Sequence, residues 1–332
     1  MRKLVSLSVM IGLFMAFPAE NSYAEPISIK VSCQNNITDH PGQALSTFKK
    51  VVEEKSKGKY KVDLYYSNSL GACDTVVQGI QFGTIHFGFE TTSNLSQFDS
   101  RLGITDCPYL FLTAADMAKV INSEFGKTHI LNILEKKGIK IYNIIPSSYR
   151  PMATIEYWRT LEDIQGKKFR STANKIHMGI ISALGMTPSP LPPSEMVPAI
   201  QQHVVDGSDT DVTGLISYRF CDVIKHVLLA DYSVVAFAFF GNDKWYKSLS
   251  DEDKAVFDEA ANAFYEDLKK RYETATEETY KELREKYNIV ITQLDPKEKA
   301  RWIERTKKVY DLLDPQQKEL VEQIRVELAK NS

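Results

Sequence analysis

Arg170 is the residue whose type and position point most directly to ligand chemistry. It follows a short predicted strand, 167–170, and precedes a predicted helix, 174–184. Open α/β sheets place their ligands at such junctions. A guanidinium is always charged, and its planar fork fits a carboxylate through two parallel hydrogen bonds. The sequence therefore predicts a carboxylate site at Arg170, with a surface or interdomain ion pair as the alternative.

The elements around Arg170 can be predicted from apolar spacing and breakers. Helix 174–184 carries four apolar residues at helical intervals and ends at Gly185. The prolines in 188–193 exclude a helix there. A second helix is expected from Ser194, with Met196, Ile200 and Val204 on one face, to end near 206–207.

The first part of the chain predicts a parallel sheet. Strands are expected at 27–33, 60–66 and 83–89, with helices at 44–54 and 75–82 between them. This alternation favours a parallel sheet whose ligand chemistry lies at the carboxyl ends of the strands. Two polar residues, Gln34 and Glu90, fall at such ends. For Glu90 the alternative is a helix cap or a solvated carboxylate.

The rest of the chain predicts further strands and one very long helix. We expect a helix at 116–135, a strand at 139–145 and at least one buried strand within 223–239. From Ser250 to about Tyr287 nothing interrupts a helical pattern, which would make a helix about 55 Å long. A coiled-coil seam is the weaker interpretation of this helix because strict heptads are absent.

Several short motifs resemble those of the solute-binding proteins of tripartite ATP-independent periplasmic (TRAP) transporters, the DctP-like family. They extend across nearly the whole chain after residue 24. The matching runs are Ser69-Leu70-Gly71, Gln81-x-Gly83-Thr84-Ile85, Pro108-Tyr109-Leu110-Phe111, Leu161-x-Asp163-Ile164-x-Gly166-x-Lys168-Phe169-Arg170, Leu184-Gly185-Met186-x-Pro188, Ser194-Glu195, Ala199-Ile200-Gln201-Gln202 and Val204-Val205-Asp206-Gly207.

This resemblance implies a fold and a set of site residues. The fold would be α/β, a two-lobed periplasmic binding protein with mixed sheets, a hinge and a long helix across both lobes. The family arginine at the position of Arg170 clamps a ligand carboxylate, and many members carry a second one twenty residues earlier, here Arg150. The alternative for Arg150 is an ion pair at the hinge. Gln34, Glu90 and Asn174 complete this part of the candidate ligand set.

The sequence departs from the family after Gly207. Relatives usually continue with Gln-Glu-Asn-Pro, whose asparagine contacts ligand, whereas Thr210 and Asp211 occupy the last two positions here. An aromatic residue that often precedes Ser-Glu is replaced by Pro193. We include Thr210 and Asp211 as candidates and hypothesise that Asp209 or Asp211 accepts a hydrogen bond from an amine or hydroxyl of the ligand. The alternative is that both are turn carboxylates that cap the next helix.

Residues 1–24 have the character of a cleaved signal peptide. A basic start, an apolar stretch from Leu4 to Phe17 and small residues at 22 and 24 predict export and cleavage before Glu25. No later stretch is apolar and long enough to predict a membrane span. We expect a periplasmic monomer, with lobe I at 27–147 plus 236–275 and lobe II at 148–235 plus 276–329.

Composition and motifs exclude other classes. The net charge of −2 does not suit nucleic-acid binding. Catalytic elbows, zinc-protease motifs and dinucleotide fingerprints are absent, and the six histidines are scattered, so we expect neither an enzyme, nor a metal, nor a cofactor. Four cysteines lie after the expected cleavage site: Cys33, Cys73, Cys107 and Cys221. The sequence leaves open whether they form two disulfides or none.

The sequence thus predicts a solute-binding protein that captures a small organic acid between two lobes and, as the resemblance implies, delivers it to a TRAP permease. Closure follows if the ligand binds the closed form more tightly. Two alternatives remain: the protein feeds a sensor instead of a permease, or the scaffold carries a periplasmic enzyme.

Overall fold

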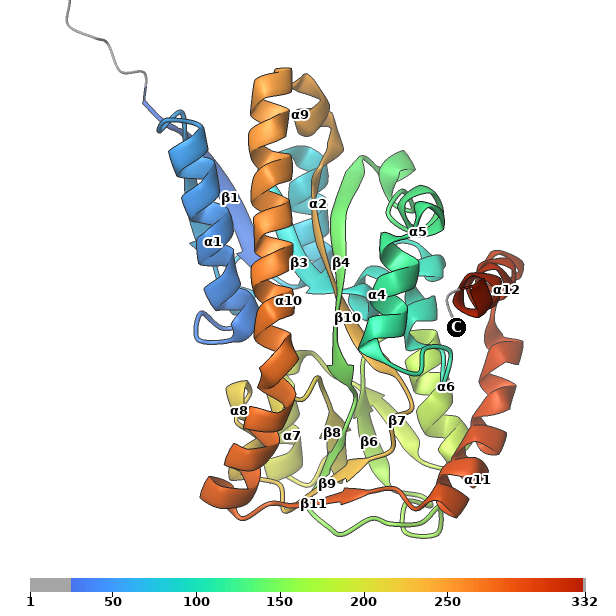
Figure 1. Ribbon diagram of the computed structural model, residues 1–332. Coiled ribbons are helices and arrows are strands. Elements are labelled where there is room, and N and C mark those ends of the chain that lie inside the picture. The colour runs from blue at the N-terminus through green and yellow to red at the C-terminus, as the bar shows by residue number, and fades with distance from the viewer. Residues whose placement is uncertain (1–24, 331–332) are drawn as a thin grey trace, which may run out of the picture.

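Two separate sheets organise residues 25–330, which are the part of the chain that the computed structural model describes (Figure 1). Sheet A has the strand order β2 (Tyr60–Tyr65), β1 (Ile27–Cys33), β3 (Phe87–Thr91), β10 (Val234–Asn242) and β4 (Ile139–Tyr149). Sheet B has the order β11 (Val290–Gln293), β9 (His226–Leu229), β5 (Met152–Thr154), β8 (Gly207–Asp209), β6 (Lys168–Ser171) and β7 (Thr187–Pro190). The expected signal peptide lies outside the described residues.

Sheet A confirms the predicted parallel arrangement of its first three strands. Strand β1 pairs in parallel with both β2 and β3, whereas β10 is antiparallel to β3 and to β4. The third strand begins at Phe87, four residues later than predicted. Gly83 adopts a left-handed conformation (φ 79°) that ends α2 (Cys73–Phe82), so 84–86 forms a connection instead of strand.

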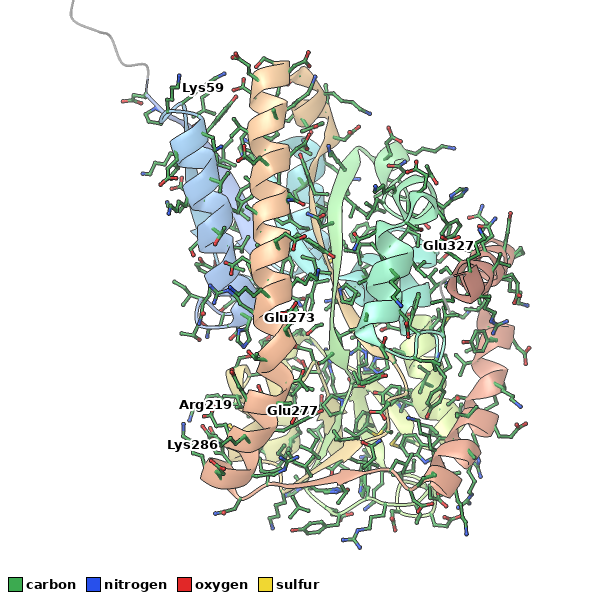
Figure 2. The ribbon with its side chains drawn as sticks, viewed as in Figure 1. Lys59, Arg219, Glu273, Glu277, Lys286 and Glu327 are labelled. Carbon is green, nitrogen blue, oxygen red and sulfur yellow. The ribbon has the colours of Figure 1, made fainter. Side chains whose placement is uncertain are left out.

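Helix α10 (Asp251–Tyr287) runs along both sheets, as the unbroken pattern predicted. Its first half packs Phe257, Phe264 and Leu268 into the apolar core over sheet A, which α1 (His40–Lys55) also covers. Near its end, Tyr280 and Leu283 belong to the core of sheet B. Glu273 and Glu277 are exposed on its outer side (Figure 2). One helix therefore connects the cores of both sheets.

Two predicted helices are shorter than expected. The segment predicted as one helix, 116–135, contains α4 (Ala114–Asn122), α5 (Glu124–His129) and the 3-10 turn η2 (Glu135–Lys137). The break comes at Ser123, which is extended and whose hydroxyl caps α5 by accepting a hydrogen bond from the Gly126 N–H.

The second of these, α7 (Met196–Gln201), ends before the predicted 206–207 because His203 takes a left-handed conformation (φ 55°). The chain then leaves the helix, and the Asp206 N–H donates to the carbonyl of Lys168 (2.8 Å). This contact leads into β8, which pairs with β6. Val204 is consequently 48% exposed instead of facing a core.

The remaining helices and 3-10 turns complete the fold. They are α3 (Thr92–Leu95), η1 (Ser100–Asp106), α6 (Lys175–Leu184), η3 (Pro193–Glu195), α8 (Gly214–Ser217), η4 (Phe220–Asp222), α9 (Asp243–Ser248), α11 (Pro296–Thr306), η5 (Lys307–Leu312) and α12 (Pro315–Lys330). Helix α11 packs on α6, whereas α12 packs on η1 and α4. The chain therefore crosses between the two sheets again near its C-terminus. The lobe boundaries given above stay a prediction.

All four cysteines are free and buried, so the structure has no disulfide among the residues that it describes. Burial raises the pKa of the Cys33 and Cys107 thiols far above the ordinary value. These thiols are therefore inert core groups. None of the described helices combines the length and the apolar character that a membrane span requires.

Candidate functional site

Two adjoining cavities lie where elements of sheet A meet elements of sheet B. Four residues line both cavities: Asn94, Arg170, Thr172 and Pro193. The inner cavity is also lined by Gln34, Thr91, Arg150, Met196, Thr210, Asp211, Tyr218, Val235 and Phe237. The outer cavity is also lined by Asn68, Ala72, Cys73, Asp74, Glu90, Gln97, Ala173, Pro190, Leu191 and Pro192. We call the two together the interlobe cleft.

Arg170 places an uncompensated cation in this cleft. Its side chain is buried (4% exposed), and its Nε and Nη2 donate to the carbonyl oxygen of Leu191 at 2.9 and 2.8 Å. Its Nη1 lies 3.4 Å from the carbonyl oxygen of Asp209. Among the described residues no carboxylate comes within ion-pair distance of Arg170. The alternative of a structural ion pair therefore finds no partner there.

The charge of Arg170 survives its burial. Desolvation lowers its pKa to about 10, and the charge of Asp209 offsets part of that effect. The group is therefore still a cation at neutral pH. Leu191 stands between Pro190 and Pro192, and a residue before proline is confined to extended conformations. The carbonyl that orients the guanidinium is thus held by a stiff segment.

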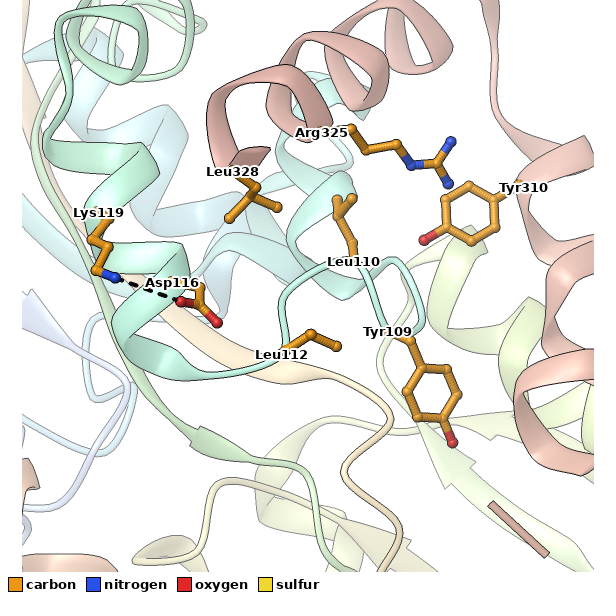
Figure 3. Close-up of a pocket in the computed structure, with 8 residues that line it drawn as sticks. All are labelled: Tyr109, Leu110, Leu112, Asp116, Lys119, Tyr310, Arg325 and Leu328. Carbon is orange, nitrogen blue, oxygen red and sulfur yellow. Dashed lines mark ion pairs between the residues drawn. The ribbon is translucent and has the colours of Figure 1, made fainter. Parts of the chain in front are cut away.

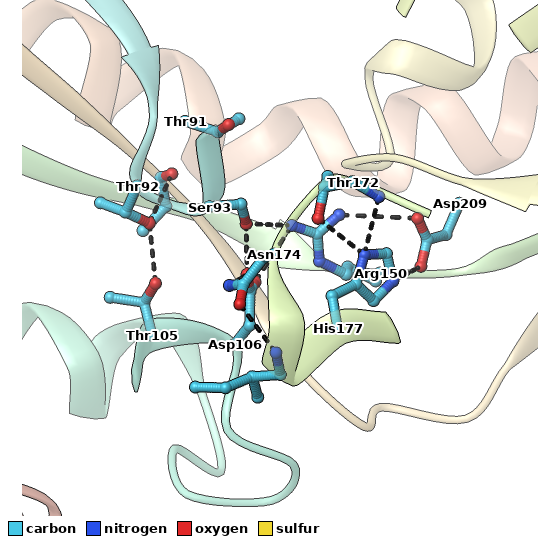
Figure 4. Close-up of polar contacts among 12 residues, drawn as sticks. Thr91, Thr92, Ser93, Thr105, Asp106, Arg150, Thr172, Asn174, His177 and Asp209 are labelled. Atoms are coloured by element: carbon cyan, nitrogen blue, oxygen red, sulfur yellow. Dashed lines mark hydrogen bonds and ion pairs between the residues drawn. The ribbon is translucent and has the colours of Figure 1, made fainter. Parts of the chain in front are cut away.

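Arg150 is part of a buried ion-pair network (Figure 4). Its Nη2 donates to the Ser93 hydroxyl at 2.9 Å and to Asp106 Oδ1 at 3.1 Å, and its Nη1 lies 3.6 Å from Asp209 Oδ1. Burial alone would lower its pKa, but Asp106 and Asp209 together raise the pKa above the ordinary value. The ion pair that the sequence left open is therefore present. Arg150 also lines the inner cavity, and its role toward a ligand stays a prediction.

Asp209 belongs to the same network instead of to a turn. It lies in β8, where His177 Nε2 donates to its Oδ2 at 2.7 Å and Tyr232 donates to the same oxygen. His177 Nδ1 accepts from the Thr172 N–H (3.1 Å), so the ring proton is on Nε2. Burial would raise the pKa of Asp209, but His177 and Arg150 hold it well below its ordinary value. The interpretation of Asp209 as a capping turn carboxylate is wrong.

Asn174 has a structural role in the described residues. Its Oδ1 accepts from the Ile176 N–H and so caps α6. Its Nδ2 donates to Asp106 Oδ2 at 2.6 Å. Both ends of the amide are occupied, and neither cavity is lined by it. The structure thus gives Asn174 a cap and a contact to η1, where the sequence predicted a ligand contact.

Glu90 and Gln34 contact each other at the carboxyl ends of β3 and β1. Glu90 is 3% exposed, accepts from Asn94 Nδ2 at 2.9 Å and lines the outer cavity. The Gln34 amide donates to the Glu90 carboxylate when its nitrogen faces that group. Glu90 is neither solvated nor a helix cap, because the Thr91 hydroxyl caps α3. Burial raises the pKa of Glu90 to about 7.

Thr210 and Asp211 line the inner cavity as a pair. Asp211 accepts from the Thr210 hydroxyl at 3.3 Å and from the Thr213 hydroxyl. It thus combines the features of a turn carboxylate before α8 with a position on the cavity wall. Two aromatic residues, Tyr218 and Phe237, also line the inner cavity, whereas Tyr149 lies on neither cavity.

Sequence reasoning missed Thr172, Asn94 and Met196 as lining residues. Thr172 follows Arg170 by two residues in an extended segment, so the two side chains point to the same side of the chain. This spacing could have identified Thr172 as a lining residue from the sequence. Asn94 follows Glu90 by four residues at the start of a short helix. No local pattern pointed to Asp106 or His177, because their partners are distant in sequence.

A third hollow lies away from the cleft, between α12 and the segment that precedes α4 (Figure 3). Its charged side chains have partners: Lys119 lies 4.0 Å from Asp116, and Arg325 pairs with Glu322 at 2.5 Å. Arg325 also stacks over Tyr310, 5.0 Å from the ring centre. This hollow therefore lacks the uncompensated charge of the cleft. Among the described residues no group of three histidine, cysteine or acidic side chains could hold a metal ion.

Comparison with known proteins identifies the family. The sequence model of the bacterial extracellular solute-binding proteins of family 7 (DctP) matches residues 34–316. A solute-binding protein of Verminephrobacter eiseniae is 28% identical over 283 residues, 84% of this chain and 83% of that protein. The C4-dicarboxylate-binding periplasmic protein DctP of Shewanella loihica is 22% identical over 311 residues, 93% and 90% of the two chains.

The structural comparison agrees with the sequence comparison. The sugar acid binding protein DctPAm of Advenella mimigardefordensis, in complex with galactonate, matches with a TM-score of 0.88 and 24% identity over 93% of this chain and 99% of that chain. This likeness confirms the predicted α/β fold of two sheets and a long helix. The chain therefore belongs to family 7 of the bacterial extracellular solute-binding proteins, the DctP family of TRAP solute-binding proteins, and is a binding protein and not an enzyme.

Proposed function

We propose that this protein captures a small organic acid in the interlobe cleft and that Arg170 binds its carboxylate. One observation carries the proposal: a guanidinium buried to 4% exposure has no carboxylate partner among the described residues. An unpaired buried charge destabilises a protein unless something neutralises it. A ligand carboxylate would do so by accepting charge-assisted hydrogen bonds from the second N–H of each Nη, since the first of each points to a backbone carbonyl.

The names of relatives support an acidic ligand. The relative in Shewanella loihica is named a C4-dicarboxylate-binding protein, and the one in Advenella mimigardefordensis is a sugar acid binding protein in complex with galactonate. Beside Arg170 we propose Gln34, Glu90, Thr210 and Asp211 as ligand contacts, since all line the cleft. Arg150 would act mainly through the network that holds the two sides of the cleft together.

A thermal-shift screen tests the proposal. The purified protein is mixed with mono- and dicarboxylates, sugar acids, keto acids, aromatic acids and amino acids. A ligand that binds the native state raises the unfolding midpoint as its concentration exceeds Kd. We expect one class of acids to raise the midpoint and Arg170→Ala to abolish the shift. The matched control, Arg305→Ala, removes an exposed arginine of α11 and should keep it. A shift that survives in Arg170→Ala would contradict the proposal.

We further propose that the protein works in the periplasm and delivers the acid to a TRAP permease. Support comes from the family and from the periplasmic relative in Shewanella loihica. Mass spectrometry of the protein from a periplasmic extract should find Glu25 as the first residue. Uptake of the acid into vesicles that contain the cognate permease should require the added binding protein. Uptake that is independent of it would favour the alternative of a sensor partner.

A further inference from the structure

The interlobe cleft contains more carboxylates than its free cation can neutralise. Glu90 and Asp211 line it, and both are 3% exposed. Asp39, the residue before α1, is buried as well at 6% exposure, and its Oδ1 has no hydrogen-bond partner in the described part of the chain. These three carboxylates form no ion pair with any described lysine, arginine or histidine. We call Glu90, Asp211 and Asp39 the acidic wall.

Glu90 lines the outer cavity and Asp211 the inner one, and Gln34, whose amide contacts Glu90, lines the inner cavity together with Asp211. Tyr218 lines the inner cavity, and the charges of Asp211, Asp39 and Glu90 all add to the effect of burial in raising the pKa of its phenol. The charge of Asp211 likewise adds to burial in raising the pKa of Asp39 to about 6. The acidic wall is therefore one electrostatic unit at the cavity that Tyr218 lines.

Arg150 is not available to balance this unit. Two carboxylates, Asp106 and Asp209, already face its guanidinium at 3.1 and 3.6 Å. Asp209 in turn has His177 and Tyr232 as partners. With His177 neutral, the network has one arginine for two carboxylates and therefore no positive charge to spare. Among the described residues that line the cleft, Arg170 remains as the cation without a carboxylate partner, and the ligand carboxylate of the proposed function would use it.

We propose that the ligand is an acid that also carries a cationic nitrogen, with its carboxylate on Arg170 and its nitrogen toward Glu90 and Asp211. This inference rests on the proposed function and narrows its ligand class to amino acids and betaine-like compounds. A cationic nitrogen would supply the partner that the acidic wall lacks. The rings of Tyr218 and Phe237, which line the same cavity, suit a cation as well.

Three other occupants fit the same wall less well. A metal ion would need a cluster of at least three suitable side chains, and the described residues offer none. The hydroxyl of a hydroxy acid could donate a hydrogen bond to Glu90 or Asp211, but it would bring no positive charge to the acidic wall. A dicarboxylate would bring a second negative charge toward the acidic wall.

Matched ligand pairs that differ in one atom type test the inference. Isothermal titration at pH 8 compares β-alanine with 3-hydroxypropanoate, 4-aminobutanoate with 4-hydroxybutanoate, and proline with tetrahydrofuran-2-carboxylate; succinate serves as the dicarboxylate. We expect the amino member of the best pair to bind at least about tenfold more tightly, which corresponds to about 1.4 kcal/mol. We expect Glu90→Gln or Asp211→Asn to reduce that ratio, since each keeps the shape and removes a charge.

The control variant is Glu273→Gln, which removes an exposed charge of α10 and should leave the ratio unchanged. Circular dichroism confirms that each variant is folded. If hydroxy acids or succinate bind as tightly as the amino acids, and Arg170→Ala abolishes their binding, the inference is overturned and the proposed function stands. If both acidic-wall variants keep the ratio, the inference is likewise overturned. If no acid binds in an Arg170-dependent manner, the proposed function itself fails.

Discussion

At the scale of residues, the cleft owes its chemistry to charges that lack partners. Arg170 is held by a backbone carbonyl, and Glu90 is held by two amides, so neither meets an opposite charge. Arg150, twenty positions before Arg170, is surrounded by carboxylates. The two arginines therefore differ in their surroundings, because the fold gives them different neighbours in space.

Arg170→Lys tests whether the fork of the guanidinium matters beyond its charge. Lysine keeps a cation but offers neither the planar fork nor the pair of bonds to Leu191 that orient it. We expect the acid identified by the screen to bind roughly ten- to a hundredfold more weakly, the loss of one charged hydrogen bond. Titration calorimetry measures this, and an unchanged Kd would show that a point charge suffices.

Glu90 makes the stability of the ligand-free protein depend on pH. Its pKa is about 7 in the folded protein, above the ordinary value of 4.5. A carboxyl group with a raised pKa stabilises the fold most at low pH, and the contribution is lost as the pH rises through 7. The free energy of unfolding should therefore fall between pH 5 and pH 8 by about 3 kcal/mol at most.

Urea unfolding of wild type and Glu90→Gln at both pH values measures this contribution. Glutamine does not titrate, so the variant should lose much less stability between pH 5 and pH 8 than the wild type. Glu273→Gln, on the exposed side of α10, should follow the wild type. Parallel pH profiles for wild type and Glu90→Gln would contradict the assignment of a buried, unpaired Glu90.

At the scale of elements, α10 links the two cores, and its start is capped by a side chain. The Ser250 hydroxyl accepts from the Asp253 N–H at 3.2 Å. Asp253 in turn pairs with Lys59, on the sheet A side, at 2.5 Å. Asp253 therefore takes part both in the local cap of α10 and in an ion pair with a residue that is distant in sequence.

Ser250→Ala should lower the free energy of unfolding by about 1 kcal/mol, because an N–H of the first turn loses its acceptor. Chemical denaturation measures the loss. Ser182→Ala, at an exposed position within α6, should be neutral or slightly stabilising, since alanine favours helix. Equal losses in the two variants would show that the effect is not one of capping.

At the scale of the whole molecule, the Arg150 network joins the two sides of the cleft. Ser93 and Asp106 come from elements next to sheet A, whereas Asp209 is in β8 of sheet B and Asn174 caps α6. Every member is buried, so a change at one member leaves others unpaired in a medium of low polarity. We expect the network to stabilise the closed arrangement of the two sides.

Arg150→Met should lower the free energy of unfolding by about 3–5 kcal/mol, because two buried carboxylates lose their cation. Asp106→Asn in the same protein should recover part of that loss, and the double-mutant cycle gives a coupling of about 0.5–3 kcal/mol. Small-angle scattering should find a larger radius of gyration for Arg150→Met. Arg305→Ala should change neither quantity. Additive effects of the two network changes would refute the pairing.

Local sequence determined the elements and the family. Apolar spacing and caps predicted α10, β1, β2 and the α6 region, and a run of motifs predicted the DctP family, because these depend on neighbours within a few residues. The break at Ser123 and the early end of α7 were missed, because a cap and a left-handed residue there outweigh apolar spacing.

The tertiary structure decided which charges have partners. Asp106, Arg150 and Asp209 are separated by more than forty residues in sequence, and the fold brings them within ion-pair distance. The same fold leaves Arg170, Glu90 and Asp211 in the cleft without opposite charges. A charged side chain has the same type in both settings, and its pKa and its availability to a ligand depend on burial and on neighbours that no local pattern specifies.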